Sequence, residues 1–527
     1  MGEQAKPASK ENLLASTAKG ASYLIMLQFI SRMLTFSLNQ IVLRYTTPDA
    51  FGIASVNLEL LASTILFISR EGFRTVLTRS SKNQQQIINL AYIPAGLGLF
   101  TTTLCCGYYL HTITPSDSAT YSYYGTSVIL YGLASFLELS VEPLFILALN
   151  KMHFQLRVGV EGTAVILRCL VTFGLTLLGK PEYSVLSFAL AQFVYGLTIM
   201  LGYFGYFMYR EKSLNNLLPR KIKDDDKKSE YWFEKTLLHL GITMTKQSLL
   251  KHVLTEGDKM LISILSTDKD KGVYGFVVNY GSLIARILFQ PLEETARTFF
   301  SKILIDKQDN TARETALNVL MTFMQFHTLL GFLFIFFATN YTNTLVDLLA
   351  GSTWSTKSNA PQVLAFYCMY VPFMGINGIT EGFVQAVATK QDLSRLSYFM
   401  ILFSACFMVS GFVFMYWFDL GALGLILANM VNLSIRVIYS WNYICAYFGI
   451  SKSICSWFPH PVTTLSFVAS WFITRWSENN VGWFTLKQKL IHICIGAICF
   501  LFVCATILWK EKALSSNMKQ LIKSKRS

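Results

Sequence analysis

Charged side chains stand inside apolar stretches of this sequence, and they are the groups with which it could do chemistry. Segment 63–79, STILFISREGFRTVLTR, begins as apolar as a membrane helix and then includes Arg70, Glu71 and Arg74. An arginine guanidinium binds a carboxylate or a phosphate through two parallel hydrogen bonds. A charge near the centre of a membrane helix costs about 2.5–3.5 kcal/mol on insertion scales, so such side chains pair internally or line a wet cavity. The pattern therefore indicates anion binding or ion pairing.

The composition places the chain in a membrane. Of its 527 residues 53% are hydrophobic and only 14% are charged, whereas roughly a quarter of a soluble protein is charged. The ten cysteines and seven histidines show no spacing typical of a disulfide framework or a metal site. The sequence also has no GxxxxGK(S/T) motif for nucleotide binding. We therefore expect no metal, no cofactor and no enzymatic activity.

Apolar runs recur along the whole chain and predict an all-α polytopic membrane protein with about fourteen transmembrane helices. The expected spans are residues 22–44, 53–77, 87–110, 123–149, 158–178, 184–209, 236–265, 273–300, 315–338, 360–388, 396–418, 423–445, 457–475 and 490–509. An even number of spans puts both termini on one side, and the distribution of Lys and Arg makes that side cytosolic. The net charge of +14 is then mostly a topology signal, and no nucleic-acid partner is expected.

Two parts of the chain repeat. Residues 50–79 align without gaps with residues 273–302, and a second match begins further along each half. The matched positions include Glu71 with Glu294, Arg74 with Arg297, and Glu142 with Glu381. Because the matched segments run in the same direction across the membrane, they predict two pseudo-symmetric six-helix bundles in a parallel repeat, as in transporters, followed by two C-terminal helices.

This repeat defines the expected domains. They are a cytosolic N-terminal segment (1–21), an N-lobe of helices 1–6 (22–209), a charged cytosolic linker (210–235), a C-lobe of helices 7–12 (236–445), helices 13–14 (446–509) and a cytosolic basic tail (510–527). The linker contains the run DDDKK at 224–228, which is typical of a solvated, self-neutralising segment.

The charges inside the expected spans fall into three groups. Candidates for binding an anionic group such as phosphate are the cations with few acidic neighbours in the sequence, together with Arg70, whose repeat position holds Glu293: Arg32, Arg70, Arg286, Lys251 and Lys259. Expected structural or gating pairs at helical spacing are Glu71 with Arg74 and Glu294 with Arg297. Membrane carboxylates with few cationic neighbours, as a proton-coupled antiporter would use, are Glu142 and Glu381.

Several segments resemble the eukaryotic Rft family, a distant branch of the superfamily of multidrug, oligosaccharidyl-lipid and polysaccharide exporters. They are GASYLIMLQFISRMLTFSLNQIVLRY, FGIASVNLELLASTILFISREGFR, VYGFVVNYGSLIARILFQPLEETAR and YVPFMGINGITEGFVQAVAT, and the resemblance covers essentially the whole chain. It implies fourteen helices in two lobes around a central cationic cavity. By similarity to flippases of this superfamily, it assigns pyrophosphate binding to Arg32, Arg70 and Arg286.

The resemblance implies a flippase for the mannosylated pyrophosphoryl-dolichol intermediate of protein N-glycosylation, moving this glycolipid from the cytosolic to the lumenal leaflet. Its expected partners are the dolichol-linked oligosaccharide, membrane lipids and other N-glycosylation enzymes, and we expect a monomer. An accessory protein that supplies the glycolipid without flipping it stays open as an alternative. A proton-coupled drug antiporter and a multispan glycosyltransferase are further alternatives, and the latter is disfavoured because the first lumenal loop offers only Asp49 as an acidic residue.

Two short signals bear on the compartment. The tail ends in KSKRS, with Lys523 and Lys525 at the spacing of a dilysine retrieval signal, which favours the endoplasmic reticulum membrane. Asn340 begins the sequon Asn-Tyr-Thr in a loop expected on the lumenal side, and is a candidate N-glycosylation site.

Overall fold

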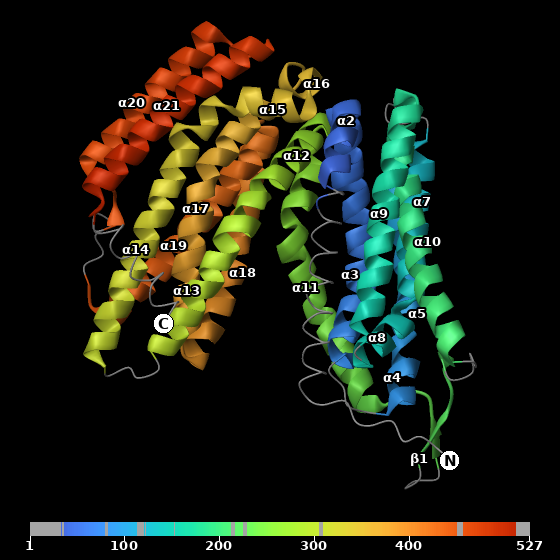
Figure 1. The fold of residues 1–527 in the computed structure, drawn as a ribbon. Coiled ribbons are helices and arrows are strands. Elements are labelled where there is room, and N and C mark those ends of the chain that lie inside the picture. The colour runs from blue at the N-terminus through green and yellow to red at the C-terminus, as the bar shows by residue number, and fades with distance from the viewer. Residues whose placement is uncertain are drawn as a thin grey trace, which may run out of the picture. The chain divides into compact units, whose positions relative to one another are not determined.

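The computed structural model describes residues 33, 36–78, 83–112, 121, 123–151, 153–211, 217–224, 229–304, 309–450 and 457–512. These residues are almost entirely helical, as Figure 1 shows. Backbone groups find no water partners inside a bilayer, so each apolar segment satisfies them internally as a helix. The chain divides into two compact units, unit 1 (Met1–Glu256) and unit 2 (Gly257–Ser527).

Unit 1 is a bundle of long helices with one small hairpin. Its elements are α2 (Pro48–Gly52), the π-helical turn η1 (Ile53–Leu58), α3 (Glu59–Leu77), α4 (Gln84–Ala91), α5 (Ile93–Thr112), α7 (Tyr124–Ser140), α8 (Glu142–Asn150), α9 (Phe154–Leu178), η2 (Pro181–Tyr183), α10 (Ser184–Glu211), β1 (Ile222–Asp224), β2 (Ser229–Tyr231) and most of α11 (Lys235–Leu265). Helix α10 packs against α7 and α9, and α3 packs against α5 and α7. A Cβ on Gly196 of α10 would collide with the backbone of Ala134 in α7, so glycine permits this close approach.

The hairpin is held on α4 by buried polar contacts. Strands β1 and β2 pair antiparallel, with Ile222 opposite Tyr231. The Asn89 side chain of α4 donates to the carbonyls of Arg220 and Trp232 at 2.6 and 2.7 Å, and it accepts from the Arg220 amide at 3.0 Å. The described strands of the expected solvated linker are therefore paired and bound to α4, and residues 225–228 of the DDDKK run lie outside the described residues.

Unit 2 is built around α17. Its elements are α12 (Asp268–Ile284), the π-helical turn η4 (Ala285–Phe289), α13 (Gln290–Ile303), α14 (Asn310–Phe336), η5 (Ala338–Asn340), α15 (Thr342–Ala350), α16 (Ser352–Ser355), α17 (Ala360–Val387), α18 (Lys390–Phe412), η6 (Val413–Trp417), α19 (Gly421–Phe448), α20 (Pro461–Val481) and α21 (Leu486–Lys510). Helix α17 contacts α12, α13, α14 and α19. The core includes Phe300, Met324, Phe383 and Ile444, each fully buried.

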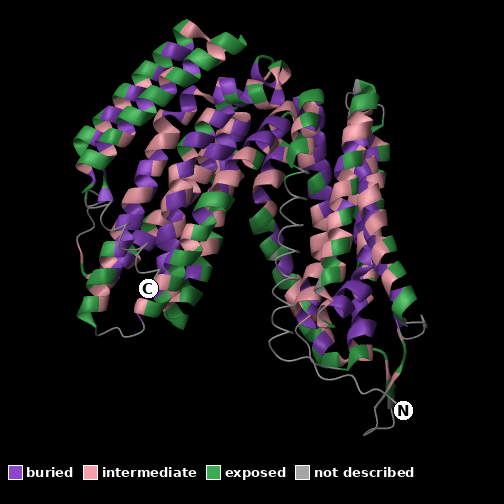
Figure 2. Ribbon diagram, viewed as in Figure 1, coloured by how far each residue is buried: buried purple, intermediate pink, exposed green. Residues whose placement is uncertain are grey.

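The last two helices pair with each other along their length and expose most of their outer surface, as Figure 2 shows. A buried carboxylate fastens one end of the pair. Glu511 accepts hydrogen bonds from Gln325 of α14 at 2.6 Å and from the backbone amide of His460, just before α20, at 2.7 Å. Near the other end, Lys489 of α21 pairs with Asp347 of α15. The two helices are thus joined to the rest of unit 2 by buried polar contacts as well as apolar ones.

The predicted sequon at Asn340 is not compatible with this packing. Asn340 is 2% exposed, and its side-chain amide donates to the Trp471 carbonyl at 3.0 Å and to the Thr474 hydroxyl at 2.8 Å. Thr342 of the sequon is also buried. A glycan on this amide would need the space that α20 fills, so the expected N-glycosylation at Asn340 is corrected to a helix-packing role.

The described residues contain ten helical stretches long and apolar enough to cross a membrane, or eleven if the bent pair α7–α8 counts as one span. Each coincides with an expected span, which confirms a polytopic all-α membrane protein. The expected first span lies mostly outside the described residues. Helices α11 and α20 occupy the expected spans 236–265 and 457–475. Both are long enough to cross a membrane, but neither is apolar enough to be counted among these stretches. The count of fourteen and the pseudo-symmetry stay predictions.

Candidate functional site

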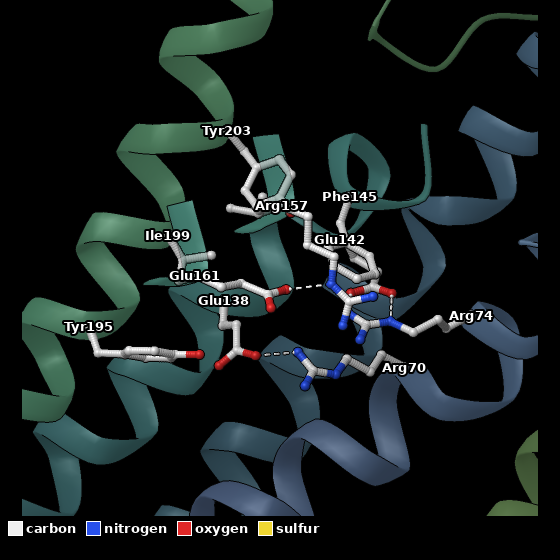
Figure 3. Close-up of a pocket in the computed structure, with 11 residues that line it drawn as sticks. Arg70, Arg74, Glu138, Glu142, Phe145, Arg157, Glu161, Tyr195, Ile199 and Tyr203 are labelled. Atoms are coloured by element: carbon white, nitrogen blue, oxygen red, sulfur yellow. Dashed lines mark hydrogen bonds and ion pairs between the residues drawn. The ribbon is translucent and has the colours of Figure 1, made fainter. Parts of the chain in front are cut away.

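A pocket of about 230 Å³ opens inside unit 1, and Figure 3 shows the side chains around it. It lies among α3, α7, α8, α9 and α10 and is lined by Arg70, Arg74, Glu138, Val141, Glu142, Phe145, Arg157, Glu161, Tyr195, Ile199 and Tyr203. Three arginines face three glutamates, so the formal charges of the wall cancel. The cation excess expected from the sequence is absent from this pocket.

Helix α3 presents two guanidinium groups to the pocket. Arg70 and Arg74 are four residues apart, which places them on the same face one turn from each other. Other faces of α3 bury Leu61, Ile65 and Phe73 in the apolar interior of unit 1, and this packing fixes how the helix is turned. The two arginines therefore form a pair of cations whose spacing and direction are fixed by the packing of α3.

A helix break presents two carboxylates to these arginines. Helix α7 ends at Ser140 and α8 begins at Glu142, with a bend of 40° between them. Pro143 has no N–H to donate and its ring crowds the preceding turn, which explains the break. Glu138 and Glu142 flank the break and are also four residues apart, so their spacing matches that of the arginines.

The two ion pairs differ in geometry and burial. Arg74 forms a bidentate pair with Glu142, with Nε–Oε1 and Nη2–Oε2 distances of 2.6 and 2.5 Å, and the Glu142 side chain is 0% exposed. Arg70 forms a single 2.5 Å contact, from Nη1 to Oε1 of Glu138, and the two side chains are 19% and 14% exposed. The pair at Glu142 is thus the stronger clamp, and Glu138 is more accessible to water than Glu142, whereas the Arg74 side chain is 24% exposed and Arg70 19%.

A third pair and an aromatic ring complete the wall. Arg157 and Glu161, one turn apart on α9, pair at 3.0 Å with side chains 45% and 37% exposed. The Phe145 ring lies next to two guanidinium groups, with its centroid 4.0 Å from Cζ of Arg74 and 5.4 Å from Cζ of Arg157. These cation–π contacts hold the two cations close together in spite of their like charge. The three arginines of the pocket are thus each paired with a carboxylate of the same wall.

The predicted pair of Glu71 with Arg74 is wrong. Arg74 turns instead to Glu142, and Glu71 contacts the Lys251 ammonium of α11 at 3.4 Å. Lys251, expected to bind substrate, is 64% exposed at its side chain and also lies 5.6 Å from the Phe67 ring centroid. The i,i+3 spacing failed as a guide because a carboxylate from a neighbouring helix offers Arg74 two hydrogen bonds at once.

The predicted pair of Glu294 with Arg297 in unit 2 is also wrong. Arg297 donates to the amide oxygen of Gln385 at 3.2 Å, and none of the described contacts joins it to Glu294. Glu381 pairs with Arg436 of α19 at 2.5 Å. The two carboxylates expected to have few cationic neighbours, Glu142 and Glu381, are therefore each held by an arginine. A proton-coupled drug antiporter would need a membrane carboxylate without a cation beside it, and neither of these two carboxylates meets this requirement.

The remaining candidates do not meet at the pocket. Arg286 of unit 2 is exposed, and its guanidinium contacts the Ser282 hydroxyl at 2.8 Å on the same helical stretch. Lys259 is half-buried and belongs to the part of α11 in unit 2. Arg32, Lys523 and Lys525 lie outside the described residues. Of the four expected phosphate-binding residues that the structure describes, Arg70 alone lines the pocket.

Sequence reasoning missed most of the pocket. Glu138, Arg157, Glu161 and Tyr195 line it, and none of them was a candidate. One signal was available. The four-residue spacing of Glu138 and Glu142 repeats that of Arg70 and Arg74, and two such pairs on neighbouring helices can form two ion pairs together.

Comparison with known sequences identifies the family. The sequence model of the Rft protein family matches residues 16–521. Three relatives are each named Man(5)GlcNAc(2)-PP-dolichol translocation protein RFT1. That of Candida glabrata is 31% identical, covering 98% of this chain and 99% of the relative. That of Xenopus tropicalis is 32% identical over 98% of both chains, and that of Mus musculus is 32% identical over 93% of both.

Solved structures with the same fold are transporters of lipids and drugs. The lipid II flippase MurJ in an inward closed conformation superposes with a TM-score of 0.55 at 14% identity, covering 93% of this chain and 99% of the other. An inward-facing multidrug resistance transporter of the MATE family gives 0.52 at 11% identity, covering 81% and 99%. At this identity the likeness shows the fold alone. The match of the family model over almost the whole length shows that this chain belongs to the Rft protein family.

Proposed function

We propose that this protein translocates the dolichol-linked oligosaccharide Man(5)GlcNAc(2)-PP-dolichol across the endoplasmic reticulum membrane, from the cytosolic to the lumenal leaflet. The observation that carries the proposal is full-length similarity to relatives that all bear the name of this translocation protein. The fold shared with a lipid II flippase supports it, because that protein also moves a lipid. Both termini are cytosolic in this proposal, and the working protein is a monomer without covalent chemistry.

The pocket of unit 1 supports a binding site for the diphosphate. The Arg70 guanidinium can fork onto one phosphate group, and Arg74, one turn away and still paired with Glu142, lines the same wall of the pocket. An aromatic ring holds two of the pocket cations near each other before any anion arrives. Arg70 is the cation we assign to the substrate, because its carboxylate partner is held by one contact only.

A second function is favoured by one specific observation. Both arginines of α3 are already paired with carboxylates. A protein that only supplies or chaperones the glycolipid, together with other N-glycosylation enzymes, would use these pairs to hold its helices together and would need no free cation.

Reconstitution separates the two functions. The purified full chain is placed in liposomes of bulk phospholipid with a labelled dolichol-linked oligosaccharide, and a leaflet-specific probe follows its movement. A transporter gives faster transbilayer movement than empty vesicles, and Arg70→Gln slows it at least tenfold. Arg475→Gln is the matched control, because Arg475 pairs with Glu478 on α20 of unit 2 and does not line the pocket. Movement no faster than in empty vesicles would establish the accessory function instead.

A further inference from the structure

The Arg70–Glu138 pair is the part of the pocket that can open. It has one contact where Arg74–Glu142 has two, and both of its side chains retain some exposure, whereas Glu142 has none. Glu138 also lies in the last turn of α7, directly before the break at Val141. Movement at the break can therefore displace Glu138 while α8 keeps Glu142 on Arg74.

An incoming phosphate creates a problem for Glu138. A phosphate that binds Arg70 must displace the carboxylate, which would then be left without a cation in a largely buried position. An unpaired buried charge is strongly unfavourable, and a carboxylate next to a phosphate also repels it. Exchange at Arg70 is favourable only if another cation accepts Glu138.

Arg168 is a cation with neutral neighbours. It lies near the middle of α9, about three helical turns or roughly 16 Å beyond Arg157. Its guanidinium donates to the amide oxygen of Gln192 at 3.0 Å, and its Cζ lies 5.4 Å from the Tyr195 ring centroid. Within the described part of the chain no carboxylate contacts Arg168. A mid-span arginine in this state is rare because of its insertion cost, and this indicates a function.

Tyr195 connects Arg168 with the pocket. It lies three residues after Gln192 on α10, so the two side chains share a face of the helix. Figure 3 shows the Tyr195 hydroxyl directed toward the Glu138 carboxylate, and both residues line the pocket. Tyr195 is within electrostatic range of Glu138, Arg168 and Arg70. A carboxylate released from Arg70 thus has a hydroxyl donor beside it and a cation next to the ring that carries this hydroxyl.

We infer that Arg168 is a positioning residue that receives Glu138, with Tyr195 as the intermediate donor, when a phosphate group takes its place on Arg70. The inference rests on the proposed function and adds the regulation of its binding site. Arg70 and Glu138 each keep a charged partner in both states of this switch. The pocket holds Glu138 on Arg70 when empty, and after exchange Arg70 holds the phosphate and Arg168 holds Glu138. Because Glu138 is in the last turn before the α7–α8 break, binding also shifts the end of α7.

A double-mutant cycle tests the switch through affinity. The probe is geranylgeranyl diphosphate, with geranylgeraniol as the uncharged control, titrated against the full chain in nanodiscs. Glu138→Gln removes the competing carboxylate and is expected to tighten binding about tenfold, whereas Arg168→Gln leaves Glu138 without a second partner and weakens it about tenfold. The double variant is expected to bind within about twofold of Glu138→Gln, because no carboxylate then needs a new partner.

The other outcomes of the cycle are equally informative. A double variant that binds about tenfold more weakly than Glu138→Gln would show that Arg168 contacts the phosphate directly, which overturns the switch. Unchanged affinity in Arg168→Gln together with a lower unfolding temperature would reduce Arg168 to a structural residue, leaving the proposed function intact. Failure of the wild-type chain to bind the diphosphate at all would overturn the proposed function and the switch together.

A second variant keeps the test open if Arg168→Gln does not fold. Gln192→Glu places a permanent carboxylate at the existing 3.0 Å contact with Arg168, which adds an ion pair to the fold and occupies this cation. Its expected effect is again about tenfold weaker binding, with an unfolding temperature at least as high as that of the wild-type chain. Wild-type affinity in this variant would overturn the switch. Arg475→Gln serves as the control for an arginine that does not line the pocket.

Discussion

The two units treat sequence-matched charged positions differently. In unit 1, Arg70 and Arg74 of α3 hold Glu138 and Glu142, one on each side of a helix break. In unit 2, the repeat places Glu293 and Arg297 on α13 opposite α17, whose polar residues at the corresponding spacing are Asn377 and Glu381. The position of Arg70 in unit 1 is thus held by the carboxylate of Glu293 in unit 2. The position of its partner Glu138 is held by an amide, Asn377.

Unit 2 rebuilds its charge balance from a third helix. Arg436 of α19 binds Glu381, and Gln385 lies between Arg297 and Glu381 with a 3.2 Å contact to each. Helix α17 is also unbroken at the positions that match the α7–α8 break in sequence, although it contains Pro372. Among the described residues, unit 1 combines two ion pairs with a helix break between their carboxylates, and the Glu381 network of unit 2 has no such break. We therefore expect exchange of a carboxylate for another anion in unit 1, and a role in holding helices together for the Glu381 network.

The largest expected effect is at the most buried pair. Glu142→Gln leaves Arg74 without its anion and is expected to lower the free energy of unfolding by about 3 kcal/mol. Glu161→Gln, in the exposed pair with Arg157, is the matched control and should change it by less than about 1 kcal/mol. Thermal unfolding of both variants in nanodiscs measures the difference. Equal effects would show that burial does not determine how much each ion pair of the pocket contributes to the free energy of unfolding.

The second largest effect is expected on removing Arg436, the cation that pairs with Glu381 in unit 2. Arg436→Gln leaves Glu381 buried with only amide partners and is expected to destabilise the protein by about 2–3 kcal/mol. Arg297→Gln should cost less than about 1 kcal/mol, because Arg297 is exposed and contacts the neutral Gln385. Denaturation curves compare the two. A larger effect at Arg297 would mean that the repeat partner of Arg74 keeps its role in unit 2.

The functional contrast between the units is tested at one pair of matched positions. Arg70→Gln is expected to slow glycolipid translocation at least tenfold with a loss of stability of about 1–2 kcal/mol. Glu293→Gln occupies the corresponding position of unit 2 and should leave the rate within about twofold, because its carboxylate lies against Gly378 of α17 and holds no cation among the described residues. Rates in the liposome assay decide this. A tenfold loss in Glu293→Gln would place part of the mechanism in unit 2.

The sequence was sufficient for the membrane fold and insufficient for the pairings within it. Apolar length alone located the spans, since a bilayer leaves a helix as the only way to satisfy the backbone. Charge inventory found Arg70, Arg74, Glu142 and Glu381 as unusual residues. It could not pair them, because their partners Glu138 and Arg436 come from helices whose packing is set by side-chain shape. Arg168 also stands in an expected span, but the sequence could not show that its partner is the neutral Gln192, nor that Asn340 is buried beneath α20.

The smallest expected effect concerns Lys251, which the sequence proposed for substrate binding and the structure places on Glu71. At 3.4 Å, with 64% of the Lys251 side chain exposed, this pair should contribute less than about 0.5 kcal/mol to stability, and less again in high salt. Lys251→Gln is therefore expected to leave both the unfolding temperature and the translocation rate within error of the wild-type values. A tenfold loss of rate at unchanged stability would extend the anion site of unit 1 from α3 to α11, and the exchange at Arg70 would then be one step of a longer path.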